Sequence, residues 1–70
     1  MTIEKRFSVD CFRSSNPLNP DGDGDQYEYW DTLDLATARA KKLFAAGRFK
    51  LVIVRDSISG EWIDVDQYPA

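Results

Sequence analysis

The sequence predicts an α+β fold in which one helix packs on one face of a four-stranded, mostly antiparallel sheet, in the order β-β-α-β-β. Three observations predict it: short segments in which apolar and polar residues alternate, one stretch in which apolar residues recur with helical spacing, and clusters of turn-forming residues between them. A chain of 70 residues forms one domain, residues 1–70, with a small core and little room for a deep cleft.

The first strand is predicted over residues 3–12, where alternation collects Phe7, Val9 and Cys11 on one face. Residues 14–25 follow with two prolines and two glycines among Ser, Asn and Asp, so we expect an exposed loop there. The short aromatic segment 26–30 alternates again and is expected to return beside the first strand.

The helix is predicted to begin after Thr32, whose hydroxyl can accept a hydrogen bond from a first-turn N–H, and to end at Gly47. Apolar residues at helical spacing form one stripe, which consists of Leu33, Ala36, Ala40, Leu43 and Phe44. Because nothing larger than alanine stands in the middle of the stripe, we expect the helix axis to lie close to the sheet.

Two more strands are predicted over 49–55 and 61–66, joined by a turn at 56–60. One set of their side chains is expected to face the helix, namely Val52, Val54, Ile63 and Val65. The other set, Leu51, Ile53 and Trp62, would then face away from the helix. The long loop, the Tyr68-Pro69 tail or a second chain must cover these three residues, which are the predicted dimer or partner face.

The composition argues against an enzyme. The chain has no His, and Cys11 is its one cysteine, so it cannot form an internal disulfide, a Cys/His zinc site or a nucleophile–histidine dyad. Asp64 and Asp66 could in principle do acid–base work, but two alternate strand residues at a solvent edge are the plainer interpretation. We predict no catalytic residue, no metal site and no cofactor.

No apolar run exceeds four residues, and the first six residues lack the pattern of a signal peptide. A lone thiol suits a reducing compartment. We therefore expect a cytoplasmic protein with no membrane association.

The segment 19–25 resembles the first half of an EF-hand calcium loop, with oxygen-bearing side chains at positions 1, 3 and 5 and Gly24 at position 6. Position 12, which should be a bidentate glutamate, is Trp30, and a strand is predicted where the motif needs a helix. The favoured interpretation is a solvated acidic turn, with weak cation binding as the alternative.

The charge is unevenly distributed, with 9 Lys+Arg and 12 Asp+Glu and a formal net charge of −3. Acidic residues occur without an intervening base through the loop and the second strand, beside aromatic residues. We predict from this a partner-binding, acidic-aromatic surface comprising Asp21, Asp23, Asp25, Glu28, Tyr29 and Asp31. Such a surface could imitate phosphates and occupy a basic groove on another protein, and ordinary surface solvation is the alternative.

The bases are concentrated later, and the alternative function is a nucleic-acid-binding accessory domain that uses Arg39, Lys42, Arg48 and Lys50. A sequence pI near 4.7 argues against direct nucleic-acid binding. The plainer interpretation is a solvated helix face that complements the helix dipole and pairs with Asp64 and Asp66.

The segment Tyr29-Trp30-Asp31-Thr32-Leu33-Asp34-Leu35-Ala36, with later cap and core positions such as Gly47 and Ser59-Gly60-Glu61, resembles a helix–hairpin pattern of many short phage, plasmid and bacterial proteins. It covers about half the chain and carries over no functional residue. Small acidic proteins of this kind are similar to several phage-encoded anti-CRISPR inhibitors. The resemblance implies a non-enzymatic inhibitor that binds a host nucleoprotein complex in the host cytoplasm. A small homodimeric domain of another role is the third hypothesis.

Overall fold

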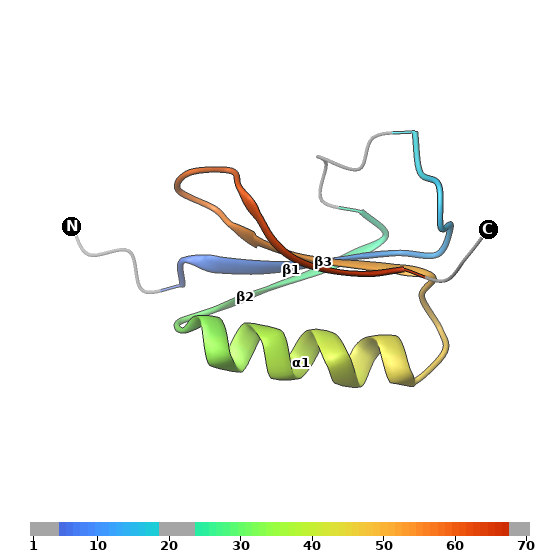
Figure 1. The fold of residues 1–70 in the computed structure, drawn as a ribbon, viewed down its shortest axis with the longest axis horizontal. Helices are drawn as coiled ribbons and strands as arrows, with labels where there is room; N and C mark the ends of the chain where they lie inside the picture. Colours follow the sequence, from blue (N-terminus) through green and yellow to red (C-terminus); the bar gives the residue numbers. More distant parts are fainter. Residues whose placement is uncertain (1–4, 19–23, 68–70) are drawn as a thin grey trace.

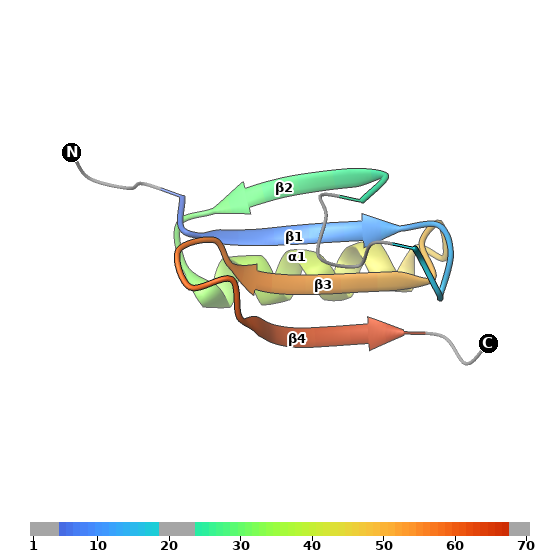
Figure 2. The same ribbon diagram turned by 90° about the horizontal axis from the view of Figure 1, so that it is seen from above.

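Four strands form one antiparallel sheet in the order β2-β1-β3-β4, and one helix packs on one face of it (Figure 1). The computed structural model describes residues 5–18 and 24–67. Its elements are β1 (Phe7–Phe12), β2 (Gln26–Trp30), α1 (Leu33–Ala45), β3 (Leu51–Asp56) and β4 (Trp62–Gln67). The predicted α+β architecture is confirmed. Figure 2 shows the four strands side by side, with β2 and β4 at the two edges and α1 behind them.

The helix begins and ends where its capping residues predict. The Thr32 hydroxyl accepts a hydrogen bond from the Leu35 amide at 3.2 Å, and Asp34 places a negative charge in the first turn. Gly47 follows the helix with a φ of +79°, the left-handed conformation that glycine adopts without strain. Within the described residues 5–18 and 24–67, no helix is long and apolar enough to cross a membrane.

The main core lies between the helix and the sheet. It consists of Val9, Cys11, Ala36, Ala40, Phe49, Val52 and Val54. Both alanines are fully buried, which confirms that the helix lies close to the strands. Phe7 and Trp30 at one end of the helix, and Leu43 and Phe44 at the other, are partly buried against this core.

The expected orientation of β4 is wrong. Val54 lies opposite Asp64 and Ile53 lies opposite Val65, and the pairing shifts by one residue between Val54 and Arg55. Because neighbours across antiparallel strands share a face, Val65 points away from the helix, like Ile53, and is 43% exposed. Ile63 adjoins the shift and is 41% exposed. The apolar pattern of β4 did not reveal this because a one-residue bulge reverses the faces.

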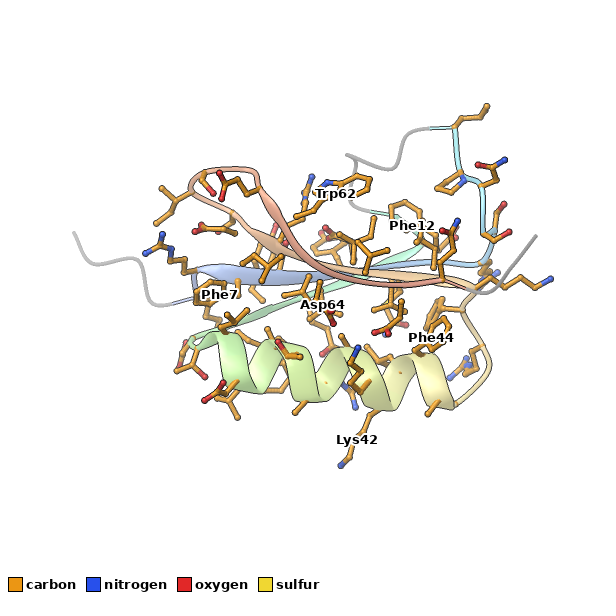
Figure 3. All side chains as sticks on the ribbon, in the orientation of Figure 1. Phe7, Phe12, Lys42, Phe44, Trp62 and Asp64 are labelled. Atoms are coloured by element: carbon orange, nitrogen blue, oxygen red, sulfur yellow. The ribbon has the colours of Figure 1, made fainter. Side chains whose placement is uncertain are left out.

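The side chains of β4 that face the helix are instead acidic. Lys41 on α1 lies 3.0 Å from the Asp64 carboxylate and 2.8 Å from the Asp66 carboxylate. Figure 3 shows Asp64 on the helix side of the sheet and Trp62 on the opposite side. The predicted pairing of helix bases with Asp64 and Asp66 is therefore present, through Lys41.

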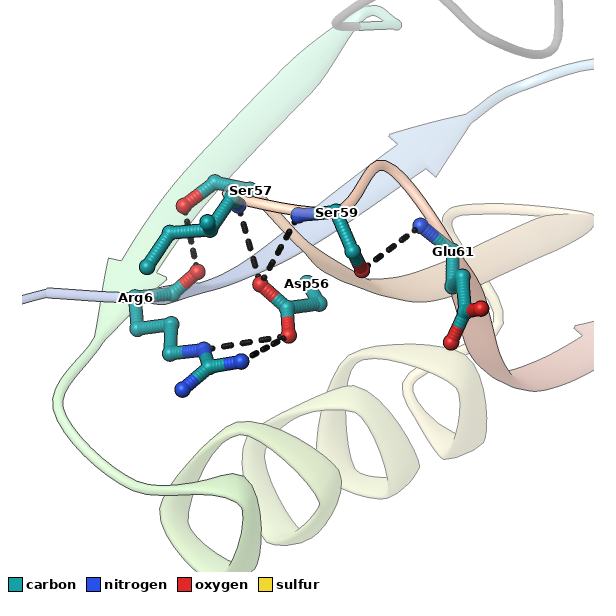
Figure 4. Close-up of polar contacts among 6 residues, drawn as sticks. Arg6, Asp56, Ser57, Ser59 and Glu61 are labelled. Atoms are coloured by element: carbon teal, nitrogen blue, oxygen red, sulfur yellow. Dashed lines mark hydrogen bonds and ion pairs between the residues drawn. The ribbon is translucent and has the colours of Figure 1, made fainter.

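A polar network joins the segment before β1 to the turn between β3 and β4 (Figure 4). Arg6 donates to the Asp56 carboxylate through Nε at 3.0 Å and Nη2 at 2.7 Å. The other carboxylate oxygen accepts from the amides of Ile58 at 2.9 Å and Ser59 at 3.4 Å. The Ser57 amide donates to the Arg6 carbonyl at 2.9 Å, which continues the pairing of β1 with β3.

Candidate partner-binding surface

The sheet face away from the helix carries exposed aromatic side chains on its outer strands. We call this the open face, and its residues are Ser8, Asp10, Phe12, Tyr27, Tyr29, Leu51, Ile53, Arg55, Trp62, Val65 and Gln67. Among the residues of the outer strands, Tyr27 is 51% exposed, and Tyr29 and Trp62 are each 43% exposed. The central members of β1 and β3 are buried or nearly so. The face therefore has a buried centre on β1 and β3 and exposed aromatic side chains at its border on β2 and β4.

One ion pair lies at the centre of the open face. The Arg55 Nε atom lies 2.9 Å from Asp10 Oδ2, and the two side chains are 18% and 1% exposed. The Ser8 hydroxyl, which is also buried, donates to the same carboxylate at 3.4 Å. Carboxylate and guanidinium neutralise each other where water is excluded, so this centre presents polar groups and no net charge.

The border aromatics are arranged by strand register. Tyr27 and Tyr29 alternate along β2, and their rings pack edge to face with centroids 5.8 Å apart. Trp62 lies on the other outer strand, opposite Arg55, which itself pairs with Ser8. Three rigid aromatic side chains thus stand on both sides of the buried ion pair.

The chain itself covers the rest of the predicted dimer face. Leu51 and Ile53 do point away from the helix, but they are only 4% and 0% exposed and form a small cluster with Phe12. A Cβ atom at Gly24 would lie 3.1 Å from the Phe12 ring, and Gln67 donates a hydrogen bond to the Ser15 carbonyl, so both described ends of the 14–25 loop reach this face. Figure 1 shows the described ends of this loop, residues 14–18 and 24–25, on the side of the sheet opposite α1. Of the three predicted residues, only Trp62 is accessible to a second chain.

The structure does not gather the predicted acidic-aromatic residues on one surface. Glu28 points to the helix side, where it accepts hydrogen bonds from Arg39 Nε at 3.0 Å and Trp30 Nε1 at 3.2 Å, whereas Tyr29 lies on the open face. Asp25 accepts a hydrogen bond from the Arg13 amide at 2.8 Å. Asp31 is exposed just before the helix. Asp21 and Asp23, and most of the calcium-loop resemblance, lie outside the described residues.

The basic residues are also divided. Arg39 is held by Glu28, whereas Lys42, Arg48 and Lys50 are exposed. Lys42 points away from the sheet (Figure 3). Arg48 lines a polar hollow of about 200 Å³ with Arg13, Asp25, Gln26 and Phe49.

A second concave region borders β2 on the helix side. This open groove of about 500 Å³ is lined by Glu28, Trp30, Leu35, Ala38, Arg39 and Lys42. This groove forms only because β2 and α1 lie side by side, so no local sequence pattern could have predicted it. Asp10 and Arg55 were missed for the same reason, although opposite charges in two predicted strands were a usable signal once the register was known.

The one thiol is not placed for chemistry. Cys11 is fully buried beneath the helix, and burial, followed by the nearby carboxylates of Glu28 and Asp10, raises the pKa of its thiol to about 11. The thiol stays protonated at neutral pH and is a core residue.

Comparisons with protein-family models, with curated proteins and with solved structures found no match to this chain.

Proposed function

We propose that the chain is a non-enzymatic module that binds a protein partner through its open face. The observation that carries this proposal is the exposure of Tyr27, Tyr29 and Trp62 around the buried Asp10–Arg55 pair. Large, rigid aromatic side chains beside a buried centre are typical of the residues that supply most of the binding free energy in compact protein interfaces.

Electrostatics favours a protein partner over a nucleic acid at this face. Its one buried acid and its one base pair with each other, so the face offers no excess positive charge to phosphates. A sheet with exposed aromatics could stack on bases, but such platforms work together with basic grooves. The chain as a whole is acidic, with a pI near 4.7.

The partner class that we propose is a nucleic-acid-processing complex, as the anti-CRISPR-like resemblance implies. A basic groove on such a complex would meet acidic side chains of this chain. The acidic contribution would come from Asp25, Asp31 and the loop acids Asp21 and Asp23, since Glu28 is already bonded to Arg39.

Quantitative capture from a host lysate, with matched variants, tests the binding surface. We expect Tyr29→Ser and Trp62→Ser to reduce the capture of a specific partner strongly, because each removes an aromatic anchor from the open face. Leu35→Ser is the control, since Leu35 is 49% exposed on the helix and lies off this face. A partner retained by both open-face variants and lost with Leu35→Ser would place the binding site elsewhere.

Charge reversal tests the acidic contribution separately. Asp25→Lys together with Asp31→Lys should weaken binding to a basic partner and reduce its salt dependence. Unchanged binding in low salt would limit the interface to the aromatic border.

The second candidate function is nucleic-acid binding by the exposed bases Lys42, Arg48 and Lys50. It predicts a gel shift at low ionic strength that disappears steeply as salt is added, because each neutralised phosphate releases counterions. The absence of a shift at micromolar protein would rule it out.

A further inference from the structure

The two edges of the sheet differ in how well they are protected against pairing with another strand. Edge strands expose backbone N–H and C=O groups, and proteins commonly block them with bulges and inward-pointing charges. β4 has both devices, a register shift at Val54/Arg55 and two carboxylates, those of Asp64 and Asp66, which share Lys41. β2 pairs regularly with β1 along its whole length, and its one charged residue, Glu28, is neutralised by Arg39.

The hydrogen-bond pattern identifies the free backbone groups of β2. The Ser57 amide donates to the Arg6 carbonyl, so Arg6 and every second residue after it direct their backbone groups toward β3. The intervening residues of β1, which are Phe7, Val9 and Cys11, therefore bond to β2, where their partners are Trp30, Glu28 and Gln26. The N–H and C=O groups of Tyr27 and Tyr29 remain, and they point out of the sheet.

These two residues can pair with themselves. We propose that β2 is the homodimer edge of this protein, at which two copies join antiparallel about a twofold axis through Glu28. In this register Tyr27 of one copy lies opposite Tyr29 of the other, and all four outward N–H groups meet outward carbonyls. If the register shifted by two residues in either direction, only one of the two tyrosines in each strand would lie opposite a tyrosine of the other copy.

The side chains fit this arrangement on both faces. On the open face, each exposed Tyr27 would pack across the strands on Tyr29 of the second copy, which buries two rings that are 51% and 43% exposed. On the helix face, the two Glu28 carboxylates would meet at the axis, and each is already bonded to an Arg39 that is 39% exposed. The groove beside β2 leaves this side of the edge open to an added strand.

The inference does not depend on the proposed function, although pairing would join two open faces into one sheet surface. Self-association would then occur at the edge strand β2 and not at the face around Leu51 and Ile53, which the chain itself buries.

Light scattering on the full chain, from micromolar to millimolar concentration, is the first measurement. We expect the mass to rise toward twice 8.0 kDa. Tyr29→Pro removes an outward N–H without breaking a bond to β1, so it should abolish the rise. Val65→Pro is the matched control, because the same alternation directs the Val65 N–H away from β3 at the opposite edge, and it should dimerise normally.

Amide hydrogen exchange on the unmodified chain is the second measurement and needs no variant to fold. We expect the amides of Tyr27 and Tyr29 to exchange rapidly in dilute protein and at least tenfold more slowly in concentrated protein. A mass of one chain at every concentration, or a dimer lost in Val65→Pro and kept in Tyr29→Pro, would overturn the proposal. Tyr27 and Tyr29 amides that exchange at the same rate in dilute and concentrated protein would overturn it as well.

Discussion

Asp10 and Arg55 show how one buried charge pair constrains a sheet face. Removing one partner of a buried ion pair takes the opposite charge away from the group that stays, which typically costs about 3–5 kcal/mol. We expect Asp10→Ala to lower the free energy of unfolding by about this amount, measured by urea denaturation. An Asp10→Leu/Arg55→Met double variant should recover most of the loss, since both charges of the pair are replaced together by apolar side chains of similar size. Equal losses in the single and double variants would contradict this account.

Cys11 provides a residue-scale test of the core. Its raised thiol pKa means that the folded chain holds a proton which the unfolded chain releases near the ordinary value of 9.0. The stability contributed by the neutral thiol should therefore decline as pH rises from 9.0 toward about 11. Comparing the unfolding free energy with that of Cys11→Ala over this range isolates the contribution, because the other titrating groups are common to both chains. If the unfolding free energies of the two chains changed in parallel with pH, a contribution from the thiol would be contradicted.

At the scale of elements, the periodicities of the sequence predicted the order of helix and strands well. Thr32 and Gly47 delimit the helix because capping and left-handed turns are local requirements. The faces of β4 could not be predicted locally, since Val65 is placed by a bulge in its pairing with β3. The binding of Asp64 and Asp66 to Lys41 likewise depends on a helix distant in sequence.

The close approach of the helix to the sheet predicts a difference between two alanines. Ala40→Leu would force extra volume into a fully buried site and should cost about 1–3 kcal/mol of stability. Ala38→Leu is the control, because Ala38 is exposed on the same helix and leucine is nearly as good a helix former. Thermal unfolding of both variants measures the difference, and equal midpoints would show that the helix can move away from the strands.

The return of the long loop to β2 depends on Gly24. A Cβ atom there would lie 2.6 Å from the Cys11 carbonyl oxygen, and its φ is +78°. Gly47 has a similar φ of +79°, but a Cβ atom there would meet nothing within 4 Å outside its chain neighbours. We expect Gly47→Ala to cost about 1–2 kcal/mol from backbone strain alone and Gly24→Ala to cost more. Urea midpoints of the two variants test this, and equal losses would show that the backbone around Cys11 can yield.

For the molecule as a whole, the sequence predicted the layers of the fold better than the surface. Glu28 and Tyr29 are adjacent in an acidic-aromatic run, yet strand alternation directs one toward Arg39 and the other to the open face. Leu51 and Ile53 were expected to be covered by the long loop, the C-terminal tail or a second chain, and the described ends of the loop reach across to their face. Surface composition depends on these long-range contacts, so patterns along the chain predict the core more readily than the binding face.

The Arg6–Asp56 contact joins parts of the chain that are 50 residues apart, so its titration should register in global stability. The hydrogen bonds from Arg6 lower the pKa of the Asp56 carboxyl to about 2, against the opposing effect of burial, and the amides of Ile58 and Ser59 add to the lowering. A depressed carboxyl pKa stabilises the fold above the ordinary value of 3.8, and this contribution is lost as pH falls from 3.8 toward about 2.

We therefore expect Asp56→Asn to lower the unfolding free energy near neutral pH and to flatten its decline between pH 3.8 and about 2. Urea unfolding at steps of pH measures both effects. Asp34→Asn is the matched control, since it replaces an exposed acid in the first turn of α1 and leaves the Arg6–Asp56 contact in place. An acid slope that is the same in Asp56→Asn and in the unmodified chain would mean that Arg6 does not hold this carboxylate in solution.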